Sequence, residues 1–366
     1  MSKILLIIVA LTCISINSNA KNPIIETKAS DTRIEYTGRT LKTNEGVSFD
    51  WSGVYARIRF EGKSLSLKCS DTKGNWFNVW IDKEMQNQED KKFFVCSKDT
   101  LINIVDKLSK GPHEVIIQKR TEGEQGTFTL HNIITEKPLL QAKGRKSRHI
   151  EFIGDSYTCG YGTESANRDC PFEAATENCN LTYAAIVSRY FNADYNLISH
   201  SGKGIYRNYD AHTTGENMPE RYVQTFDMHK DIKWNPEEAP YKPDLVVIYL
   251  GTNDFSTGMQ PNKSLFCEKY IKLMEQIRKN YGKDIPVVCM ASKAADELYD
   301  YVKTAAYMNG LDNVAYLGYT PMVHNNEDEL GASWHPNYKG HRKIATSLVP
   351  YISTITGWEL EDKIIK

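Results

Sequence analysis

The spacing of hydrophobic residues changes near residue 144, and the change divides the chain into two parts. Before it, apolar and polar residues alternate in short runs at 53–68, 76–81, 113–119 and 127–134. Alternation with a period of two is typical of strands that bury one face. Repeated short strands of this kind predict a β-sandwich, jelly-roll-like, over residues 21–144.

After a basic linker at 143–148, apolar residues occur in compact runs at 150–153, 195–198, 245–250 and 286–290. Runs without alternation indicate strands that are buried on both faces. Between and after them, 265–279 and 339–352 carry apolar residues at helical spacing. Alternating strands and helices predict an α/β domain over residues 145–366, with a parallel sheet between two helical layers.

The first twenty residues have the pattern of a signal peptide. Lys3 precedes an apolar run at 4–16, and Ser18-Asn-Ala20 fits a small-x-small cleavage site. We therefore expect cleavage after Ala20 and a secreted or periplasmic protein. Because no apolar run reaches about 18 residues, we expect no membrane-spanning helix.

Composition limits the function classes. The chain has 366 residues, with 45 Lys and Arg against 46 Asp and Glu, and a net charge of −1. Its length fits two domains or one large one. The balanced charge argues against nucleic-acid binding, which usually requires a basic face. Composition says nothing of oligomeric state.

Eight cysteines are present, and cleavage after Ala20 would remove Cys13 and leave an odd number. An odd number excludes a complete set of disulfides. Cys170 and Cys179 bracket a polar loop and are our predicted bridge, whereas Cys69 and Cys289 lie in apolar runs and are expected to be buried thiols. No cysteine spacing resembles a zinc site, so we expect no metal.

Candidate chemistry follows the predicted parallel strands, at the sheet edge where open α/β proteins place their sites. Ser156 follows the first run in Gly-Asp-Ser, a glycine-containing loop at 199–204 follows the second, and Asn253 follows the third in Gly-Thr-Asn-Asp. His335 stands in Trp-His-Pro before the last helix. We expect these loops to meet.

These residue types suit acyl transfer. A serine hydroxyl becomes a good nucleophile when a histidine removes its proton. The resulting oxyanion requires fixed donors, for which the main-chain N–H of Ser156, a glycine N–H and the amide of Asn253 are candidates. Taken alone, Ser156 could instead cap a helix. Asp155 is expected to hydrogen-bond the loop that holds the serine.

The four blocks resemble those of SGNH/GDSL-type hydrolases. With the sandwich in front, the runs TCGYG, SGKGIYRNY and WHPN resemble carbohydrate esterase family 2 more specifically. The resemblance implies an exported serine esterase that removes O-acetyl groups from xylan- or glucomannan-type polysaccharide, without a cofactor. It implies Ser156 as nucleophile, His335 as base, Asn253 and Gly204 as oxyanion donors, and Trp334 and Tyr206 as substrate-binding aromatics. Gly202 is the alternative glycine, and Trp334 could instead belong to the core.

The chain departs from the SGNH pattern at one position. The aspartate that usually stands three residues before the histidine is Ala332 here. We therefore expect a Ser–His dyad with the imidazole held by main-chain oxygen, although Glu327, Asp328 or Glu329 could fold back. Two other functions remain open: an esterase for another acyl ester, such as O-acetylated peptidoglycan, and an inactive carbohydrate-binding protein.

Overall fold

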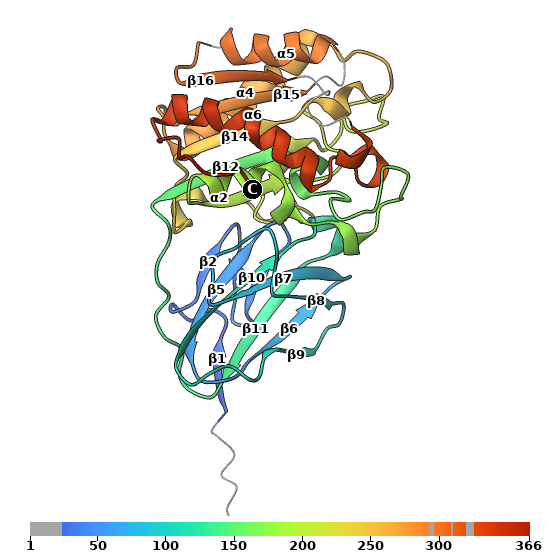
Figure 1. Cartoon of the computed structure of the whole chain (residues 1–366). Coiled ribbons are helices and arrows are strands. Elements are labelled where there is room, and N and C mark those ends of the chain that lie inside the picture. The colour runs from blue at the N-terminus through green and yellow to red at the C-terminus, as the bar shows by residue number, and fades with distance from the viewer. Residues whose placement is uncertain (1–23, 293–295, 309, 320–325) are drawn as a thin grey trace, which may run out of the picture.

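A computed structural model describes residues 24–292, 296–308, 310–319 and 326–366. It has an antiparallel β-sandwich at the N-terminal side and a layered α/β part above it (Figure 1). The predicted signal peptide at 1–20 lies outside the described residues. Over the described ranges, no helix is long and apolar enough to cross a membrane.

The sandwich consists of two antiparallel sheets. In the first, the strand order is β3-β4-β11-β6-β9 and β1 pairs with β11; in the second, it is β2-β5-β10-β7-β8. The strands are β1 Ile25–Lys28, β2 Glu35–Thr37, β3 Leu41–Lys42, β4 Val47–Phe49, β5 Tyr55–Glu61, β6 Leu65–Asp71, β7 Asn75–Ile81, β8 Lys91–Val95, β9 Thr100–Val105, β10 Pro112–Lys119 and β11 Phe128–Thr135.

The burial of individual strands explains their sequence patterns. In β6, Leu65, Leu67 and Cys69 are buried between the sheets while the residues between them are partly exposed. In β10, every residue after Pro112 is buried. The reason is that the second sheet of the sandwich has the other sheet on one side and the α/β part on the other.

The α/β part is built on a parallel sheet with strand order β13-β12-β14-β15-β16. Its strands are β12 Arg148–Gly154, β13 Ala193–Ser199, β14 Leu245–Tyr249, β15 Val287–Ser292 and β16 Val314–Tyr319. Its helices are α1 Ser156–Cys159, α2 Tyr183–Tyr190, α3 Met218–Arg221, α4 Lys263–Tyr281, α5 Asp296–Tyr307 and α6 Tyr338–Thr356.

Alternate residues along each parallel strand pack against the helical layers on opposite faces of the sheet. Val247 of β14 packs in the cluster that includes α2 and α6, whereas Val246 and Ile248 pack in the cluster that includes α4. The predicted three-layer fold is therefore confirmed. The boundary at 144/145 stays a prediction.

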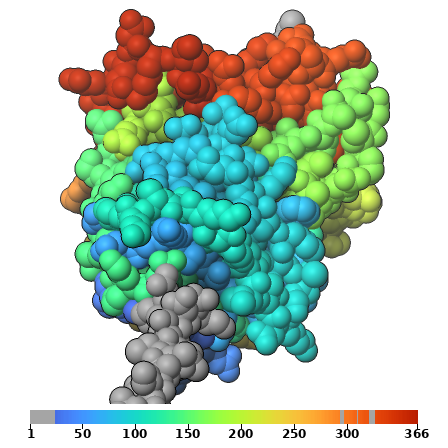
Figure 2. Space-filling model, turned by 60° about the horizontal axis from the view of Figure 1, so that its bottom comes forward, coloured from blue at the N-terminus to red at the C-terminus, as the bar shows by residue number. Residues whose placement is uncertain are grey.

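The sandwich packs against the α/β part. Seen from the sandwich side, its blue to teal surface occupies the middle of the view, and the orange to red segments of the α/β part lie above it (Figure 2). Tyr55 donates a hydrogen bond of 2.7 Å to Asp194, and Gln118 donates one of 2.8 Å to Tyr195. These bonds join β5 and β10 to the edge strand β13.

The predicted Cys170–Cys179 disulfide is wrong. Cys179 is buried and its Sγ lies 3.5 Å from the carbonyl oxygen of Lys119 in the sandwich, whereas Cys170 is half-buried and lies 3.5 Å from Asn167 Oδ1. The two thiols therefore lie in different surroundings. Cys69 and Cys289 are buried free thiols, as predicted.

Candidate active site

Ser156 is the first residue of α1, and only Asp155 separates it from the end of β12. Asp155 caps this short helix, because its Oδ1 accepts the N–H of Tyr157 at 3.2 Å. The predicted role of Asp155 in the serine loop is confirmed. The side chain of Ser156 is largely shielded, with the residue 8% exposed. The cap thus helps to hold the start of the helix, where Ser156 lies, in one place.

His335 lies against Ser156. Its Nε2 is 2.8 Å from Ser156 Oγ, although the two residues are 179 positions apart. Its Nδ1 lies 3.0 Å from the carbonyl oxygen of Ser333 and 3.2 Å from that of Ala332. Since a carbonyl oxygen only accepts, Nδ1 carries the proton and Nε2 is left to accept from the serine.

The loop before His335 has an unusual backbone. Ser333 and Trp334 both adopt left-handed conformations, with φ of 50° and 65°. Such a conformation costs a non-glycine residue about 1–2 kcal/mol. Hydrogen bonds from Ser333 N to Cys170 O (3.1 Å) and from His335 N to Ala332 O (3.0 Å) hold it. The packing of the polar loop that contains Cys170 therefore fixes the histidine.

The three nearby acidic residues are engaged elsewhere. Glu327 pairs with Arg168 at 2.8 Å, Asp328 with Lys339 at 3.1 Å, and Glu329 with Lys343. Burial lowers the pKa of His335 to about 4, and the carbonyl groups of Ser333 and Ala332 only partly oppose this. The imidazole is therefore neutral near pH 7 and able to accept a proton.

Aromatic rings that the sequence analysis assigned no role enclose the imidazole. Tyr161 stacks on His335 with ring centroids 4.2 Å apart, and Tyr157 meets it edge-on at 5.5 Å. Tyr161 lies within the TCGYG run that follows the serine, so its position next to a catalytic block was the available signal. Both rings restrict the imidazole to one orientation.

Asn253 lies in the short 3-10 helix Thr252–Phe255 that follows β14, beside the serine loop. Its Nδ2 donates to Asp155 Oδ2 at 3.2 Å and to the carbonyl oxygen of Lys203 at 3.0 Å. The amide thus connects the loop after β14 with the serine loop and with the glycine-containing loop at 199–204. Burial raises the pKa of Asp155 to about 7.

Asp254 holds the glycine-containing loop that begins at residue 199 and follows β13, which is called the second block below. Its carboxylate accepts the main-chain N–H groups of Ile205 (2.9 Å), Tyr206 (2.7 Å) and Arg207 (2.9 Å). Gly204 is packed closely here, since a Cβ at this position would lie 2.1 Å from Arg207 O. Its N–H donates to Asn208 Oδ1 at 3.3 Å. Gly202, with φ of 76°, accepts Tyr209 N at 2.7 Å.

The two predicted substrate-binding aromatics differ in exposure. Trp334 is 57% exposed beside His335, so the alternative that it belongs to the core is wrong. The guanidinium of Arg168 lies 4.2 Å from the centre of its ring. Tyr206 is half-buried, packs on the core that includes α4, and has the Lys269 ammonium 6.0 Å from its ring centre.

Within the described residues, one group has the spacing of metal ligands. A single ligand atom from each of Glu122, Cys159 and Glu177 lies within 4.8 Å of the others. The buried ammonium of Lys119 donates to the carbonyl oxygen of Glu122 at 3.0 Å. A cation already stands beside this group, so its composition does not favour a metal.

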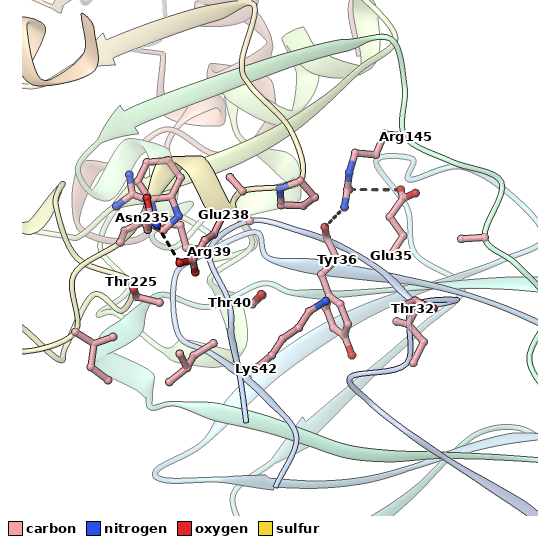
Figure 3. Close-up of a pocket in the computed structure, with 18 of the residues that line it drawn as sticks. Thr32, Glu35, Tyr36, Arg39, Thr40, Lys42, Arg145, Thr225, Asn235 and Glu238 are labelled. Carbon is pink, nitrogen blue, oxygen red and sulfur yellow. Dashed lines mark hydrogen bonds and ion pairs between the residues drawn. The ribbon is translucent and has the colours of Figure 1, made fainter. Parts of the chain in front are cut away.

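A pocket of about 620 Å³ lies between the sandwich and the α/β part (Figure 3). Segments 225–240, which lead into β14, line one side of it, so it lies at the opposite end of that strand from Asn253. In its lining, Arg145 pairs with Glu35 at 3.6 Å (Figure 3). It holds none of the predicted site residues.

Comparison with known families divides the chain in the same way as the sheets do. Residues 36–142 match "Carbohydrate esterase 2 N-terminal", and residues 152–343 match "GDSL-like Lipase/Acylhydrolase family". The second match contains Ser156, Asn253 and His335.

Similar proteins extend over both parts. An acetylxylan esterase/glucomannan deacetylase of Cellvibrio japonicus is 29% identical in an alignment of length 343 that covers 87% of this chain and 90% of that protein. Cellulase/esterase CelE of Acetivibrio thermocellus is 30% identical in an alignment of length 334 that covers 89% of this chain. The match spans 40% of CelE.

A solved structure shows the same arrangement. A family two carbohydrate esterase from Clostridium thermocellum, in complex with cellohexaose, superposes with a TM-score of 0.81 at 30% identity. The match covers 89% of this chain and all of that one.

Proposed function

This chain is a carbohydrate esterase of the GDSL-like lipase/acylhydrolase family, and from that premise we propose that it removes O-acetyl groups from xylan- or glucomannan-type polysaccharide through a Ser156–His335 dyad. The observation that carries the proposal is the 2.8 Å contact between Ser156 Oγ and His335 Nε2. The exported state proposed for the chain rests on the pattern of residues 1–20.

The reaction runs in two steps. His335 Nε2 takes the proton of Ser156 as the hydroxyl attacks the acetyl carbonyl, and the protonated imidazole then gives that proton to the departing sugar oxygen. An acetyl-serine remains. His335 next removes a proton from water, which attacks the acetyl-serine, and the proton returns to Ser156 as acetate leaves.

A dyad is supported by the surroundings of Nδ1. The carbonyl oxygens of Ser333 and Ala332 face it, at 3.0 and 3.2 Å. They take the orienting role that a carboxylate has in a triad, without its full negative charge. The two aromatic rings against the imidazole add to the orientation.

The oxyanion is assigned to the N–H of Ser156, the N–H of Gly204 and the amide of Asn253. In the free enzyme the Asn253 amide donates to Lys203 O and Asp155, and the Gly204 N–H donates to Asn208. We propose that a developing oxyanion draws these donors away from the oxygens of Lys203 and Asn208, which are neutral, since charged acceptors form the stronger bonds. Trp334 and Tyr206 are proposed to contact the sugar.

The test is acetate release from acetylated xylan, acetylated glucomannan and a small aryl acetate. We expect Ser156→Ala to abolish release from all three. Asn253→Ala should lower kcat by about 10²–10³, the usual effect of losing one oxyanion donor. Thermal unfolding of each variant controls for folding.

The pattern of substrates separates the proposal from its rivals. Polysaccharide binding without turnover by the folded wild-type protein would make it an inactive binder. Turnover of the aryl acetate alone would move the substrate to another acyl ester, such as O-acetylated peptidoglycan. Either result contradicts the polysaccharide deacetylase.

A further inference from the structure

A short segment of the sandwich reaches the second catalytic block. It follows β10 and comprises residues 121–125, referred to below as the sandwich clasp. Glu122 Oε2 accepts the main-chain N–H of Ser201 at 2.7 Å. Glu124 Oε1 lies 3.5 Å from His200 Nε2. Two adjacent residues of the block that contains Gly202 and Gly204 are therefore contacted by carboxylates from the other domain.

Buried contacts fix the sandwich clasp in place. The Lys119 ammonium donates to Thr121 O at 2.5 Å and to Glu122 O at 3.0 Å. The N–H of Glu122 donates to Glu177 Oε2 at 3.0 Å. Every one of these side chains is buried. The main chain that carries Glu122 is thus held from both domains.

The fit between the domains is also close at Gly123. A Cβ there would lie 2.4 Å from Asp227 Oδ2. The same oxygen accepts a hydrogen bond of 2.6 Å from His200 Nδ1. There is therefore no room for a side chain at position 123, between the sandwich clasp and Asp227, which hydrogen-bonds His200 of the second block.

Glu122 also contacts the helix of the nucleophile. Its Oε2 lies 3.6 Å from Sγ of Cys159, the last residue of α1, and that sulfur lies 3.3 Å from Ser199 Oγ. One carboxylate therefore contacts the serine helix and the oxyanion-side loop together. Burial and the nearby Glu122 raise the pKa of Glu177 well above its usual range.

We propose that Glu122 is a positioning residue of the esterase, which sets the main chain at Ser201 and through it the glycine N–H donors of the second block. The inference rests on the proposed acyl-enzyme mechanism. Because a displacement of about 1 Å can cost 10²-fold in rate, a carboxylate outside the α/β domain controls turnover.

The experiment compares three variants in the full chain, measured as kcat and KM on an aryl acetate. Glu122→Gln keeps an acceptor at the same reach and should retain kcat within about threefold of wild type. Glu122→Asp keeps the charge but draws the acceptor back by one methylene, and should lower kcat at least about tenfold with KM nearly unchanged. Glu122→Ala should lower kcat further.

Tyr55→Phe is the matched control. It also removes a buried hydrogen bond between the domains, but Asp194 lies at the start of β13, away from the catalytic end of the strand. Its kcat should equal that of wild type. The kcat of Glu122→Gln can be compared with that of Glu122→Asp even if the alanine variant does not fold. Melting temperatures identify the folded variants.

Two outcomes overturn the inference. If all folded Glu122 variants have the kcat of wild type while their melting temperatures fall, the residue acts on stability alone. If Glu122→Asp is as active as Glu122→Gln, the acceptor position does not matter. Absence of acetate release from the wild type itself would instead overturn the proposed function, and Ser156→Ala provides that baseline.

Discussion

At the scale of single residues, the imidazole of His335 determines what the site can do. It is enclosed by Tyr161 and Tyr157, and carbonyl oxygens face its Nδ1. None of these neighbours carries a charge that would stabilise a protonated ring as a carboxylate does. Burial consequently prevails, and the pKa of His335 falls to about 4.

The pH profile of the enzyme should reflect this. Because the base must be neutral to act, kcat/KM should stay level from about pH 8 down to pH 5 and fall as the pH passes below about 4. The measurement is kcat/KM on an aryl acetate across this range, with tryptophan fluorescence at each pH to confirm folding. An inflection near 6.5, the ordinary pKa of histidine, would contradict the prediction.

At this scale, candidate residues could be found from sequence where a reactive residue type stands at a recognisable place. Ser156 and Asn253 each follow a predicted strand, and His335 precedes the last predicted helix. Tyr161 was missed, because its nearness to Ser156 along the chain did not indicate that its ring would stack on His335. The wrong Cys170–Cys179 pairing has a similar cause: separation along the chain did not reveal that Cys179 packs on the sandwich.

At the scale of elements, compact apolar runs identified four strands of the parallel sheet, since both of their faces are buried. The fifth strand, β16, escaped prediction because it lies at the edge, where several residues are partly exposed. In the sandwich, β3 has only two residues, which is too short for an alternation of apolar and polar residues to be recognised. Elements were therefore predictable in proportion to their burial.

The cap of α1 gives an element-scale prediction. Burial raises the pKa of Asp155 from 3.8 to about 7, so the folded state binds its proton more tightly than the unfolded state does. Asp155 therefore contributes stability below about pH 4, and that contribution is lost as the pH rises through about 7.

Asp155→Asn removes this titration and keeps an oxygen to accept the N–H of Tyr157. Urea unfolding of both proteins between pH 4 and 8 measures the effect. The difference in unfolding free energy between wild type and variant should shift against wild type as the pH rises from 4 to 7. A shift in the opposite direction would mean that the ionised carboxylate is the better cap.

At the scale of the whole molecule, the second sheet of the sandwich is an interior layer. Every residue of β10 after Pro112 is buried, and side chains of β5 and β10 hydrogen-bond with β13. The buried Arg57 also pairs with Asp194 across this boundary, at 3.4 Å. Separation of the domains would break these bonds and expose to water Tyr55, Trp80 and Ile116, which pack in one cluster with residues of the α/β part, and this costs free energy.

We therefore expect the two domains to unfold in one transition. Hydrogen exchange followed by mass spectrometry should show β10 and β12 peptides losing protection at the same urea concentration. In Tyr55→Phe the common midpoint should fall for both peptides together. Separate midpoints in the wild type would show that the domains are independent.

The sandwich clasp has a consequence for how such enzymes can be recombined. The match to CelE extends over 89% of this chain, and thus over both domains, within a protein that is more than twice as long as the matched region. If a sandwich residue holds the oxyanion-side loop, the hydrolase domain is not a portable unit by itself. The smallest part that can be moved between larger proteins with its activity intact is the pair, cut outside both domains and never at the linker between them.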